Sequence, residues 1–212
     1  MKILVTGAAG FIGSHVANAL LARGDEVVGL DNVNDYYDPS LKQARLDELA
    51  PFEKFEFHKG DVADTEFLDE VCEEHDFDAV VHLAAQAGVR YSLENPDAYI
   101  HSNIMGTQSV LATLVKYDID SLVFASSSSV YDDNRKVPFS EDDKTDSPRS
   151  LYGATKKACE VMCYSYHSLH GINMTGLRYF TVYGPWGRPD LALFKFTRAI
   201  LAGETIDVYN NG

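Results

Sequence analysis

Short runs of β-branched and aromatic residues alternate along this chain with longer amphipathic segments. The short runs are KILVT (2–6), EVVGL (26–30), FEFH (55–58), AVVHLA (79–84), SLVFAS (121–126) and NMTGLRYF (173–180). The amphipathic segments cover 11–23, 64–74, 97–117, 152–169 and 190–202. Strands that alternate with helices at this spacing favour right-handed βαβ crossovers. The sequence therefore predicts an α/β fold with a doubly wound parallel sheet, whose ligands bind at the carboxyl ends of the strands.

Two segments without a clear period interrupt this pattern. Residues 32–52 are rich in Asp and Tyr, and residues 131–149 are acidic and contain two prolines. We expect both to be long loops, which in a compact domain are usually functional or mobile.

Charge and hydropathy exclude several classes of partner. The 212 residues carry a formal net charge of -14, which repels nucleic-acid phosphates and anionic membrane surfaces. No apolar run approaches the roughly 20 residues of a membrane span, and residues 1–6 are too short for a secretory leader. We therefore expect a cytoplasmic protein without nucleic-acid or membrane partners. Cys72, Cys159 and Cys163 lack the neighbouring ligands of a zinc site, so we expect reduced packing residues and no metal.

A glycine-rich turn, VTGAAGFIGSH, links the first expected strand to the first expected helix. Gly7, Gly10 and Gly13 follow a G-x-x-G-x-x-G pattern, in which glycine lets the backbone approach a pyrophosphate at the helix amino terminus. We expect Phe11 and Ile12, within this turn, to contact the same ligand. A tight turn without a ligand is the simpler alternative.

The second and third expected strands end in residues suited to an adenosine. Asp31 lies 18 residues after Gly13 and is followed by Asn32; a carboxylate there accepts hydrogen bonds from a ribose and repels a 2′-phosphate. NAD is therefore favoured over NADP. Asp61 and Val62 close the third strand and are placed to contact adenine, although an Asp that caps the next helix explains Asp61 as well.

Hydroxyl groups gather at the end of the fifth expected strand, in Ser126 to Ser129. Buried hydroxyls need partners, so this cluster favours a polar pocket over a core. Tyr152 and Lys156 follow at i,i+4 spacing on one helix face. A nearby ammonium and an oxidised nicotinamide favour the phenolate, which makes a tyrosine able to remove a proton from an alcohol. The simpler interpretation is a packed tyrosine and a solvated lysine.

Taken together, these motifs resemble the extended short-chain dehydrogenase/reductases, a Rossmann-like family, over the whole chain. The resemblance rests on the glycine turn, HLAA (82–85), SNIMGT (102–107), Ser-Val-Tyr and Y-x-x-x-K. Further segments are similar to the UDP-glucuronate 4-epimerase branch: AQAGVRYSLENP (85–96), SSSSVY (126–131) and RYFTVYGPWGRPD (178–190). The resemblance implies NAD as cofactor, a UDP-sugar substrate, a homodimer formed through helices 97–117 and 152–169, and redox-neutral inversion at C4 of a UDP-hexuronic acid.

The same resemblance implies roles for individual residues. Ser127, Tyr152 and Lys156 would be catalytic, with Tyr152 as base and Lys156 binding the nicotinamide ribose. The remaining cofactor contacts would be Leu83, Ala84, Ala85, Asn103, which also braces the active-site helix, and Tyr179. Neutral hydroxyls would hold the sugar carboxylate, and two arginines are cationic candidates for the carboxylate or diphosphate: Ser128, Ser129, Thr181, Arg90 and Arg188. For Arg90 a surface salt bridge is an equal alternative.

The chain also departs from the family pattern. Asp132 and Asp133 stand where relatives usually have glycine and a small residue, which predicts a distorted loop, and Leu151 replaces a common proline. Relatives continue further, and Asn-Asn-Gly at 210–212 is a turn signal that normally leads into another element. We expect an NAD-binding domain over 1–180 and the start of a truncated nucleotide-sugar region over 181–212, with most of the carboxyl-terminal substrate domain missing.

Three alternatives remain open from the sequence. A UDP-glucose 4-epimerase or a UDP-glucuronate decarboxylase of the same superfamily would share these motifs. A non-catalytic NAD-binding sensor or inactive fragment would keep the glycine turn without turnover. Assembly through the two long helices would be a property of the fragment even without catalysis.

Overall fold

The computed structural model describes residues 1–132 and 134–208. In this part of the chain six strands form one parallel sheet in the order β3-β2-β1-β4-β5-β6. The strands are β1 (Lys2–Thr6), β2 (Glu26–Asp31), β3 (Phe55–Lys59), β4 (Ala79–His82), β5 (Ser121–Ser127) and β6 (Asn173–Tyr179). The chain adds β2 and β3 on one side of β1, then crosses to its other side for β4, β5 and β6. The predicted doubly wound parallel sheet is confirmed.

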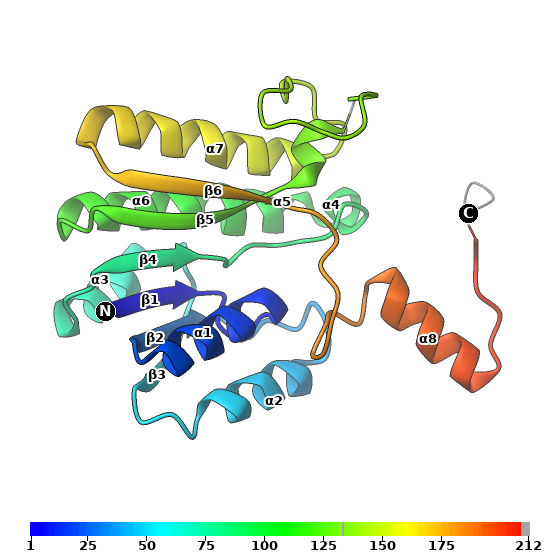
Figure 1. Cartoon of the computed structure of the whole chain (residues 1–212), viewed down its shortest axis with the longest axis horizontal. Helices are drawn as coiled ribbons and strands as arrows, with labels where there is room; N and C mark the ends of the chain where they lie inside the picture. Colours follow the sequence, from blue (N-terminus) through cyan, green and yellow to red (C-terminus); the bar gives the residue numbers. More distant parts are fainter. Residues whose placement is uncertain (133, 209–212) are drawn as a thin grey trace.

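Helices cover both faces of this sheet. They are α1 (Phe11–Arg23), α2 (Pro39–Leu49), α3 (Thr65–Glu74), α4 (Tyr91–Glu94), α5 (Pro96–Tyr99), α6 (Gly106–Lys116), α7 (Leu151–His170) and α8 (Ala192–Ala202). One face packs against α1 and α2, and the other against α3, α6 and α7 (Figure 1). This arrangement follows from right-handed crossovers on either side of β1.

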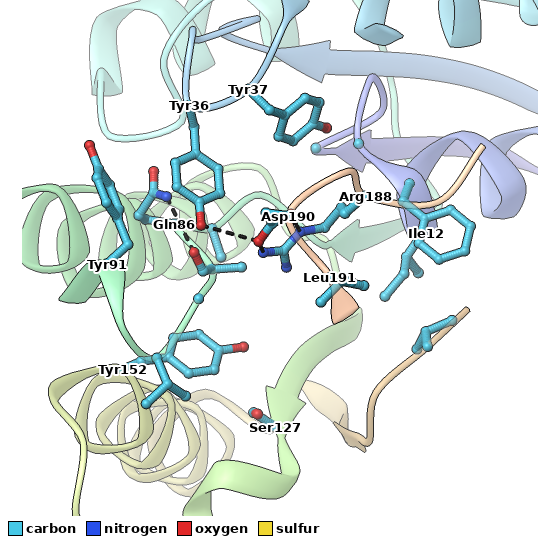
Figure 2. A pocket seen from close by; sticks show the side chains of 18 of the residues that line it. Ile12, Tyr36, Tyr37, Gln86, Tyr91, Ser127, Tyr152, Arg188, Asp190 and Leu191 are labelled. Atoms are coloured by element: carbon cyan, nitrogen blue, oxygen red, sulfur yellow. Dashed lines mark hydrogen bonds and ion pairs between the residues drawn. The ribbon is translucent and has the colours of Figure 1, made fainter. Parts of the chain in front are cut away.

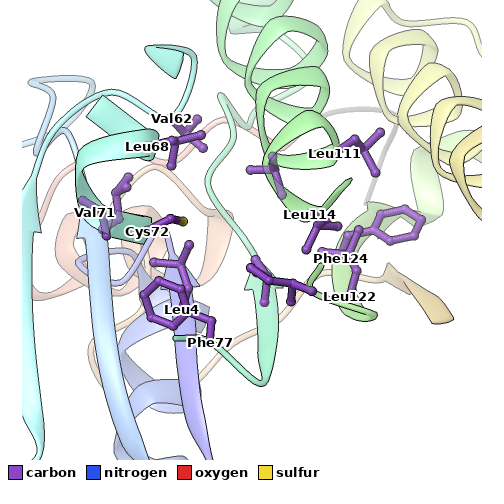
Figure 3. Packing of buried hydrophobic residues seen from close by; sticks show 14 of the residues in the cluster. Leu4, Val62, Leu68, Val71, Cys72, Phe77, Leu111, Leu114, Leu122 and Phe124 are labelled. Atoms are coloured by element: carbon purple, nitrogen blue, oxygen red, sulfur yellow. The ribbon is translucent and has the colours of Figure 1, made fainter. Parts of the chain in front are cut away.

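Alternate residues of the central strand β1 enter two separate cores. Leu4 points into the larger cluster, with Leu68 of α3, Leu111 of α6 and Leu122 of β5 (Figure 3). Ile3 and Val5 point the other way, into the cluster under α1 and α2. Because successive strand residues face opposite sides, a strand buried on both faces is apolar throughout. Each fully buried leucine contributes about 1.5–3 kcal/mol relative to exposure.

The predicted loop at 32–52 is wrong in part, because its second half forms α2. The local signal is the Asp-Pro pair that precedes it. Asp38 caps the helix by accepting a hydrogen bond from the Ser40 amide at 2.9 Å, and Pro39 occupies the first turn, where its missing N–H costs nothing. A buried stripe of Lys42, Arg45, Leu46 and Leu49 follows. Because two of these buried residues are cations, the stripe does not appear as a helical repeat of apolar residues in the sequence.

The expected helix at 97–117 also differs from the prediction. It is built of α5, a π-helical turn at Ile100–Met105, and α6. π-helical turns are rare and are frequent at functional sites. By contrast, the loop expected at 131–149 contains no helix or strand over its described residues after Tyr131, which ends a 3-10 turn (Ser128–Tyr131).

The last described segment leaves the sheet after β6. Figure 1 shows α8 lying apart from the sheet, on the side toward which the strands point, and none of its residues is buried. Within the described residues no helix has the length and apolar character needed to cross a membrane. All three cysteines are free and buried. Asp133 and the Asn-Asn-Gly turn at 210–212 lie outside the described residues.

Candidate active site

One large cavity lies at the carboxyl ends of the strands, with a volume of about 1080 Å³. It brings together nearly all of the site residues predicted from the sequence. The predicted residues that line it are Gly7, Gly10, Phe11, Ile12, Gly13, Asp31, Asn32, Asp61, Val62, Leu83, Ala84, Ala85, Arg90, Ser127, Ser128, Ser129, Tyr152, Lys156, Tyr179, Thr181 and Arg188. Asn103 is the exception: it is buried and is not part of the cavity wall.

The glycine turn has no space for side chains. Gly7 has a φ of 74°, and a Cβ there would lie 2.7 Å from the Ala84 amide nitrogen. A Cβ on Gly13 would lie 2.0 Å from the Gly7 carbonyl oxygen. Gly10 is the N-cap of α1 and brings no side chain to the first-turn amides. The helix amino terminus therefore points unshielded amide donors at the cavity, as an anion site requires.

Asp31 lies beside this turn at the end of β2. Its carboxylate accepts hydrogen bonds from the Ala9 amide at 3.2 Å and the Val33 amide at 2.8 Å, and Lys42 Nζ is 3.9 Å away. Burial raises the pKa of Asp31, while Lys42 and the two amides oppose that rise. Each carboxylate oxygen has a further lone pair, so the side chain keeps the capacity to accept hydrogen bonds from a ribose.

Arg45 was missed by the sequence analysis, although it is almost fully buried. Its guanidinium donates to the carbonyl oxygens of Ala9, at 3.0 Å, and of Trp186, at 2.7 Å. It also donates to the Tyr37 hydroxyl at 2.6 Å. The side chain therefore ties the glycine turn to the 184–190 segment, which it brings close to that turn. This contact spans 141 residues of sequence, so no local pattern could have indicated it.

The predicted catalytic residues come from two elements that face each other. Ser127 ends β5, and Tyr152 lies in the first turn of α7; Figure 2 shows both side chains on the wall of the cavity. The Ser127 hydroxyl accepts from the Ser129 amide at 3.2 Å. Lys156 is buried, and its ammonium donates to the Ala125 carbonyl oxygen at 2.8 Å. Helical spacing and this anchor hold the ammonium on the same face as the phenol.

Ser126 differs from the other serines of the cluster. Its hydroxyl donates to Glu160 at 2.6 Å, and Glu160 forms a bidentate ion pair with Arg178 at 2.8 and 3.0 Å. Arg178 also donates to the Tyr131 hydroxyl at 2.7 Å. This network joins β5, β6 and α7. It therefore fixes the strand end that carries Ser127, so Ser126 serves mainly as a structural partner.

Asn103 braces α7, the helix that carries Tyr152 and Lys156. Its amide donates to the Thr155 hydroxyl on α7 at 2.9 Å and to the Gln86 carbonyl at 3.1 Å, while its oxygen accepts from the Gln86 amide at 2.8 Å. Asp61 is not the cap of the following helix, because Asp64 fills that position by accepting from the Glu66 and Phe67 amides. The Asp61 carboxylate instead accepts from the Ala63 amide and pairs with His101 at 3.1 Å.

The expected substrate side contains a second charged group that sequence reasoning missed. Arg188 forms a bidentate pair with Asp190, with Nε to Oδ1 at 3.0 Å and Nη2 to Oδ2 at 2.5 Å. The Tyr36 hydroxyl donates to the same carboxylate at 3.2 Å (Figure 2). Thr181 and Arg90 are exposed at the cavity wall, and Ser128 and Ser129 are half-buried.

Comparison with known proteins places this architecture in a family. Residues 3–212 match the NAD dependent epimerase/dehydratase family. The chain belongs to the NAD-dependent epimerase/dehydratase family.

Individual members of the epimerase/dehydratase family are closely similar to the chain. It is 58% identical over 212 residues to an uncharacterized 37.6 kDa protein of Escherichia coli O111:H-, and spans 63% of it. It is 55% identical over 212 residues to UDP-glucuronate 4-epimerase 4 of Arabidopsis thaliana, of which it spans 48%. The structure of UDP-glucuronic acid 4-epimerase from Bacillus cereus, in complex with UDP-glucuronic acid and NAD, superposes on the whole chain with a TM-score of 0.92 at 38% identity; the chain covers 67% of it. The chain thus spans about half to two thirds of these relatives.

A buried polar chain connects the end of β1, beside the glycine turn, to α7. Thr6, at the end of β1, accepts from the Leu83 and Ala84 amides through its hydroxyl oxygen, so its one proton goes to His82 Nδ1 at 2.8 Å. His82 Nε2 must then carry the ring proton and donate to the Thr107 hydroxyl at 3.2 Å.

The chain continues from Thr107 into the helix. The Thr107 hydroxyl donates to Cys159 Sγ at 3.3 Å, and the Cys159 thiol donates to the Asn103 carbonyl oxygen at 3.2 Å. Each member has its partner, and the chain crosses from β1 through β4 and α6 to α7. Cys159 is therefore a packing residue that also positions the π-helical turn.

Because His82 is neutral and buried, the stability of the fold is expected to fall in mild acid. Burial lowers the pKa of His82 to about 3, with a smaller contribution from Lys156, against about 6.5 in the unfolded chain. The unfolded state therefore binds one more proton below pH 6.5, so this stability is present above pH 6.5 and is lost as pH falls toward 3. From pH 7.5 to 5 the loss is about 2 kcal/mol.

Urea unfolding of the wild type and of His82→Gln at pH 7.5 and 5 measures this contribution. Between pH 7.5 and pH 5, the free energy of unfolding of His82→Gln is expected to fall by about 2 kcal/mol less than that of the wild type. His170→Gln, at the exposed end of α7, is the control and should follow the wild type. Equal pH dependence in the wild type and His82→Gln would contradict the assignment.

Asp132, at the position where the resemblance implied a glycine, joins the loop to α7. Its carboxylate accepts from the Arg149 amide at 3.3 Å and the Ser150 hydroxyl at 3.4 Å. Ser150 in turn caps α7 by accepting from the Gly153 amide at 3.0 Å. Leu151 begins the helix without a break. The substitution thus supports the amino terminus of the helix that carries Tyr152.

Proposed function

We propose that this chain forms the cofactor-binding part of an NAD-dependent UDP-hexuronic acid 4-epimerase, which interconverts UDP-glucuronate and UDP-galacturonate. The observation that carries the proposal is that Ser127, Tyr152 and Lys156 share one cavity with the glycine turn and Asp31. The plant relative named UDP-glucuronate 4-epimerase and the Bacillus cereus enzyme, whose structure contains UDP-glucuronic acid and NAD, support the choice of substrate and cofactor.

The residues present fit a dinucleotide. The missing Cβ atoms of Gly7 and Gly13 keep the backbone close to the cavity, and the α1 amides would hold a pyrophosphate. Asp31 would accept hydrogen bonds from the adenosine ribose. Lys42, 3.9 Å from that carboxylate, offsets part of its charge, and Lys156 would donate to the nicotinamide ribose.

In the proposed reaction the protein supplies the acid–base chemistry. When bound, NAD would take up a hydride from C4 of the sugar and return it to the opposite face. Tyr152, as phenolate, would remove the proton of the C4 hydroxyl and later give it back. The Lys156 ammonium lies on the same helix face as this side chain, and the Ser127 hydroxyl would hydrogen-bond the same sugar oxygen. No net reductant is consumed.

Neutral donors would protect the sugar from losing its carboxylate. A 4-keto uronate is a β-keto acid, which loses carbon dioxide when the carboxylate stands perpendicular to the carbonyl plane. We propose that Ser128, Ser129 and Thr181 hold the carboxylate in another orientation. Arg188, a candidate for the diphosphate side, is already paired with Asp190, which limits its pull on a carboxylate.

Incubation of the full-length protein with UDP-glucuronate, followed by separation of nucleotide sugars, tests the function. The expected product is UDP-galacturonate with little UDP-pentose. In the same assay Ser128→Ala combined with Thr181→Ala is expected to raise the UDP-pentose share several-fold, because the carboxylate is released to rotate. An unchanged ratio in that double variant would contradict the role of the hydroxyls.

The same assay separates the alternatives. UDP-pentose as the main wild-type product would indicate a decarboxylase, and turnover of UDP-glucose alone would indicate a UDP-glucose 4-epimerase. NAD binding without turnover of either sugar would favour a non-catalytic sensor. The presence of both Tyr152 and Lys156 in the cavity argues against that alternative.

Two features support proposals about organisation. We propose that the sugar-nucleotide side begins at residue 181, since Thr181, Arg188 and Asp190 line the same cavity as the expected cofactor contacts of 1–180. Apolar side chains are exposed on the expected dimer helices, among them Met105 and Tyr164. We propose that these helices pair in a homodimer.

A further inference from the structure

Four side chains with metal-binding atoms meet at the edge of the sheet, outside the candidate active site. Glu56 and His58 are two residues apart on the edge strand β3, so they point to the same side. Glu74 is the last residue of α3, and His75 follows it as the C-cap. One ligand atom from each of the four lies within 4.8 Å of every other. None of the four lines the active-site cavity.

Both histidine rings of this cluster lie close to the Glu56 carboxylate. His58 Nε2 lies 2.8 Å from Glu56 Oε1, and His75 Nε2 lies 3.6 Å from Glu56 Oε2. The second separation is too long for a hydrogen bond. His75 Nε2 is buried and has no hydrogen-bond partner among the described residues, which is the only such side-chain atom in the described part of the chain. A buried polar atom without a partner calls for a ligand.

Packing fixes the direction of the two imidazoles. The His75 ring lies against Phe77 at 5.6 Å and against His58 at 5.8 Å, nearly perpendicular at 82°. The side chains of His58 and His75 are only 20% and 12% exposed, whereas Glu56 is 53% exposed. The nitrogen donors are therefore held in place, and the carboxylate can move to meet an ion.

We propose that Glu56, His58, Glu74 and His75 form a binding site for Zn²⁺. Two imidazole nitrogens and two carboxylate oxygens are donors that suit zinc, whereas Mg²⁺ and Ca²⁺ prefer oxygen alone. Tetrahedral zinc, with bonds of about 2.1 Å, places donor atoms about 3.4 Å apart. The 3.6 Å between His75 and Glu56 is close to that value, and replacing the His58–Glu56 contact by the ion opens the 2.8 Å pair.

The sequence led us to expect no metal, because the four ligands of this proposed site do not form a recognisable sequence motif. They come in two pairs, at the end of a helix and on the preceding strand, and the fold brings them together. Zn²⁺ there would join the edge strand β3 to the end of α3. The two carboxylates would balance the charge of the ion, so the proposed role is structural.

Competition between the protein and a chromophoric zinc chelator tests the proposal, with Zn²⁺ as the probe and the full chain without a histidine tag. One Zn²⁺ per chain is expected. The double variant His58→Ala with His75→Ala should weaken binding at least about 100-fold, and Glu56→Gln about 10-fold. His170→Ala is the matched control, because it removes a histidine outside the cluster, and it should bind as the wild type does.

A second measurement uses only the wild-type chain, so it tests the proposal even if the double variant folds poorly. Co²⁺ added to the wild-type chain should give the intense visible absorption of a tetrahedral site, and Zn²⁺ should remove it. Wild-type affinity no higher than that of the double variant, an equal loss in His170→Ala, or an octahedral Co²⁺ spectrum would each overturn the proposal.

Discussion

Gly13→Ala is expected to weaken NAD binding strongly and to lower the free energy of unfolding by about 3 kcal/mol or more. The added Cβ would lie 2.0 Å from the Gly7 carbonyl oxygen and 2.7 Å from the Gly7 carbonyl carbon, and both are backbone atoms. No side-chain rotation relieves such a contact. The turn must open, which withdraws the α1 amides from the position where they would meet a pyrophosphate. We expect the NAD affinity to fall at least about 100-fold, which is ~2.7 kcal/mol of binding free energy.

Gly24→Ala is the matched control at the other end of the same helix. Gly24 has a φ of 99°, but nothing lies within 4 Å of a Cβ built there. Gly24→Ala should lower the free energy of unfolding by about 1 kcal/mol, through backbone strain alone, and should leave the NAD affinity unchanged. Isothermal titration with NAD and urea unfolding measure both quantities. Wild-type NAD affinity in Gly13→Ala would contradict the placement of the cofactor.

The sheet and the cofactor turn were predictable because their signals are local. Apolar strands alternate with amphipathic helices, and Gly7, Gly10 and Gly13 fall between the first strand and helix. Tyr152 and Lys156 are one helical turn apart, so their shared face followed from spacing alone. These patterns require no knowledge of contacts between distant residues.

The parts that were missed depend on distant contacts. Arg45 and Lys42 are charged residues in a buried helix stripe, and their partners are Trp186 and Asp31. The apolar pattern of α2 is therefore incomplete, and only the Asp-Pro start of the helix marked it. Asp190, whose carboxylate accepts from the Tyr36 hydroxyl 154 residues away in the sequence, likewise gave no recognisable local signal.

Tertiary contacts also determine which partner each serine hydroxyl of this cluster has. The four adjacent serines looked equivalent in the sequence, and all four line the cavity, but the Ser126 hydroxyl donates to Glu160 while the Ser127 hydroxyl accepts from the Ser129 amide. Strand alternation separates them, because neighbouring residues point to opposite sides. The exact partner of Ser126 came only from the packing of α7 on β5.

Tyr152→Phe is the second substitution with a large expected effect, a fall in kcat of about 10³-fold or more. Phenylalanine keeps the ring and its edge-on contact with Tyr99, whose centroid is 6.1 Å away. Only the hydroxyl is removed, and with it the proposed base for the C4 proton. NAD affinity and the free energy of unfolding should stay close to wild-type values, since the glycine turn and Lys156 are untouched.

Tyr164→Phe provides the matched control on the same helix. Tyr164 lies three turns along α7 and its side chain is largely exposed, away from the candidate active-site cavity. Losing its hydroxyl should change neither turnover nor cofactor binding. The pair of variants therefore separates the chemistry of one phenol from a general effect of removing a hydroxyl on α7.

The most direct test is the rate of UDP-galacturonate formation from UDP-glucuronate by full-length wild type, Tyr152→Phe and Tyr164→Phe, each with bound NAD confirmed. The proposed role of Tyr152 predicts near-complete loss in Tyr152→Phe alone. Turnover by Tyr152→Phe within a few-fold of the wild type would contradict it.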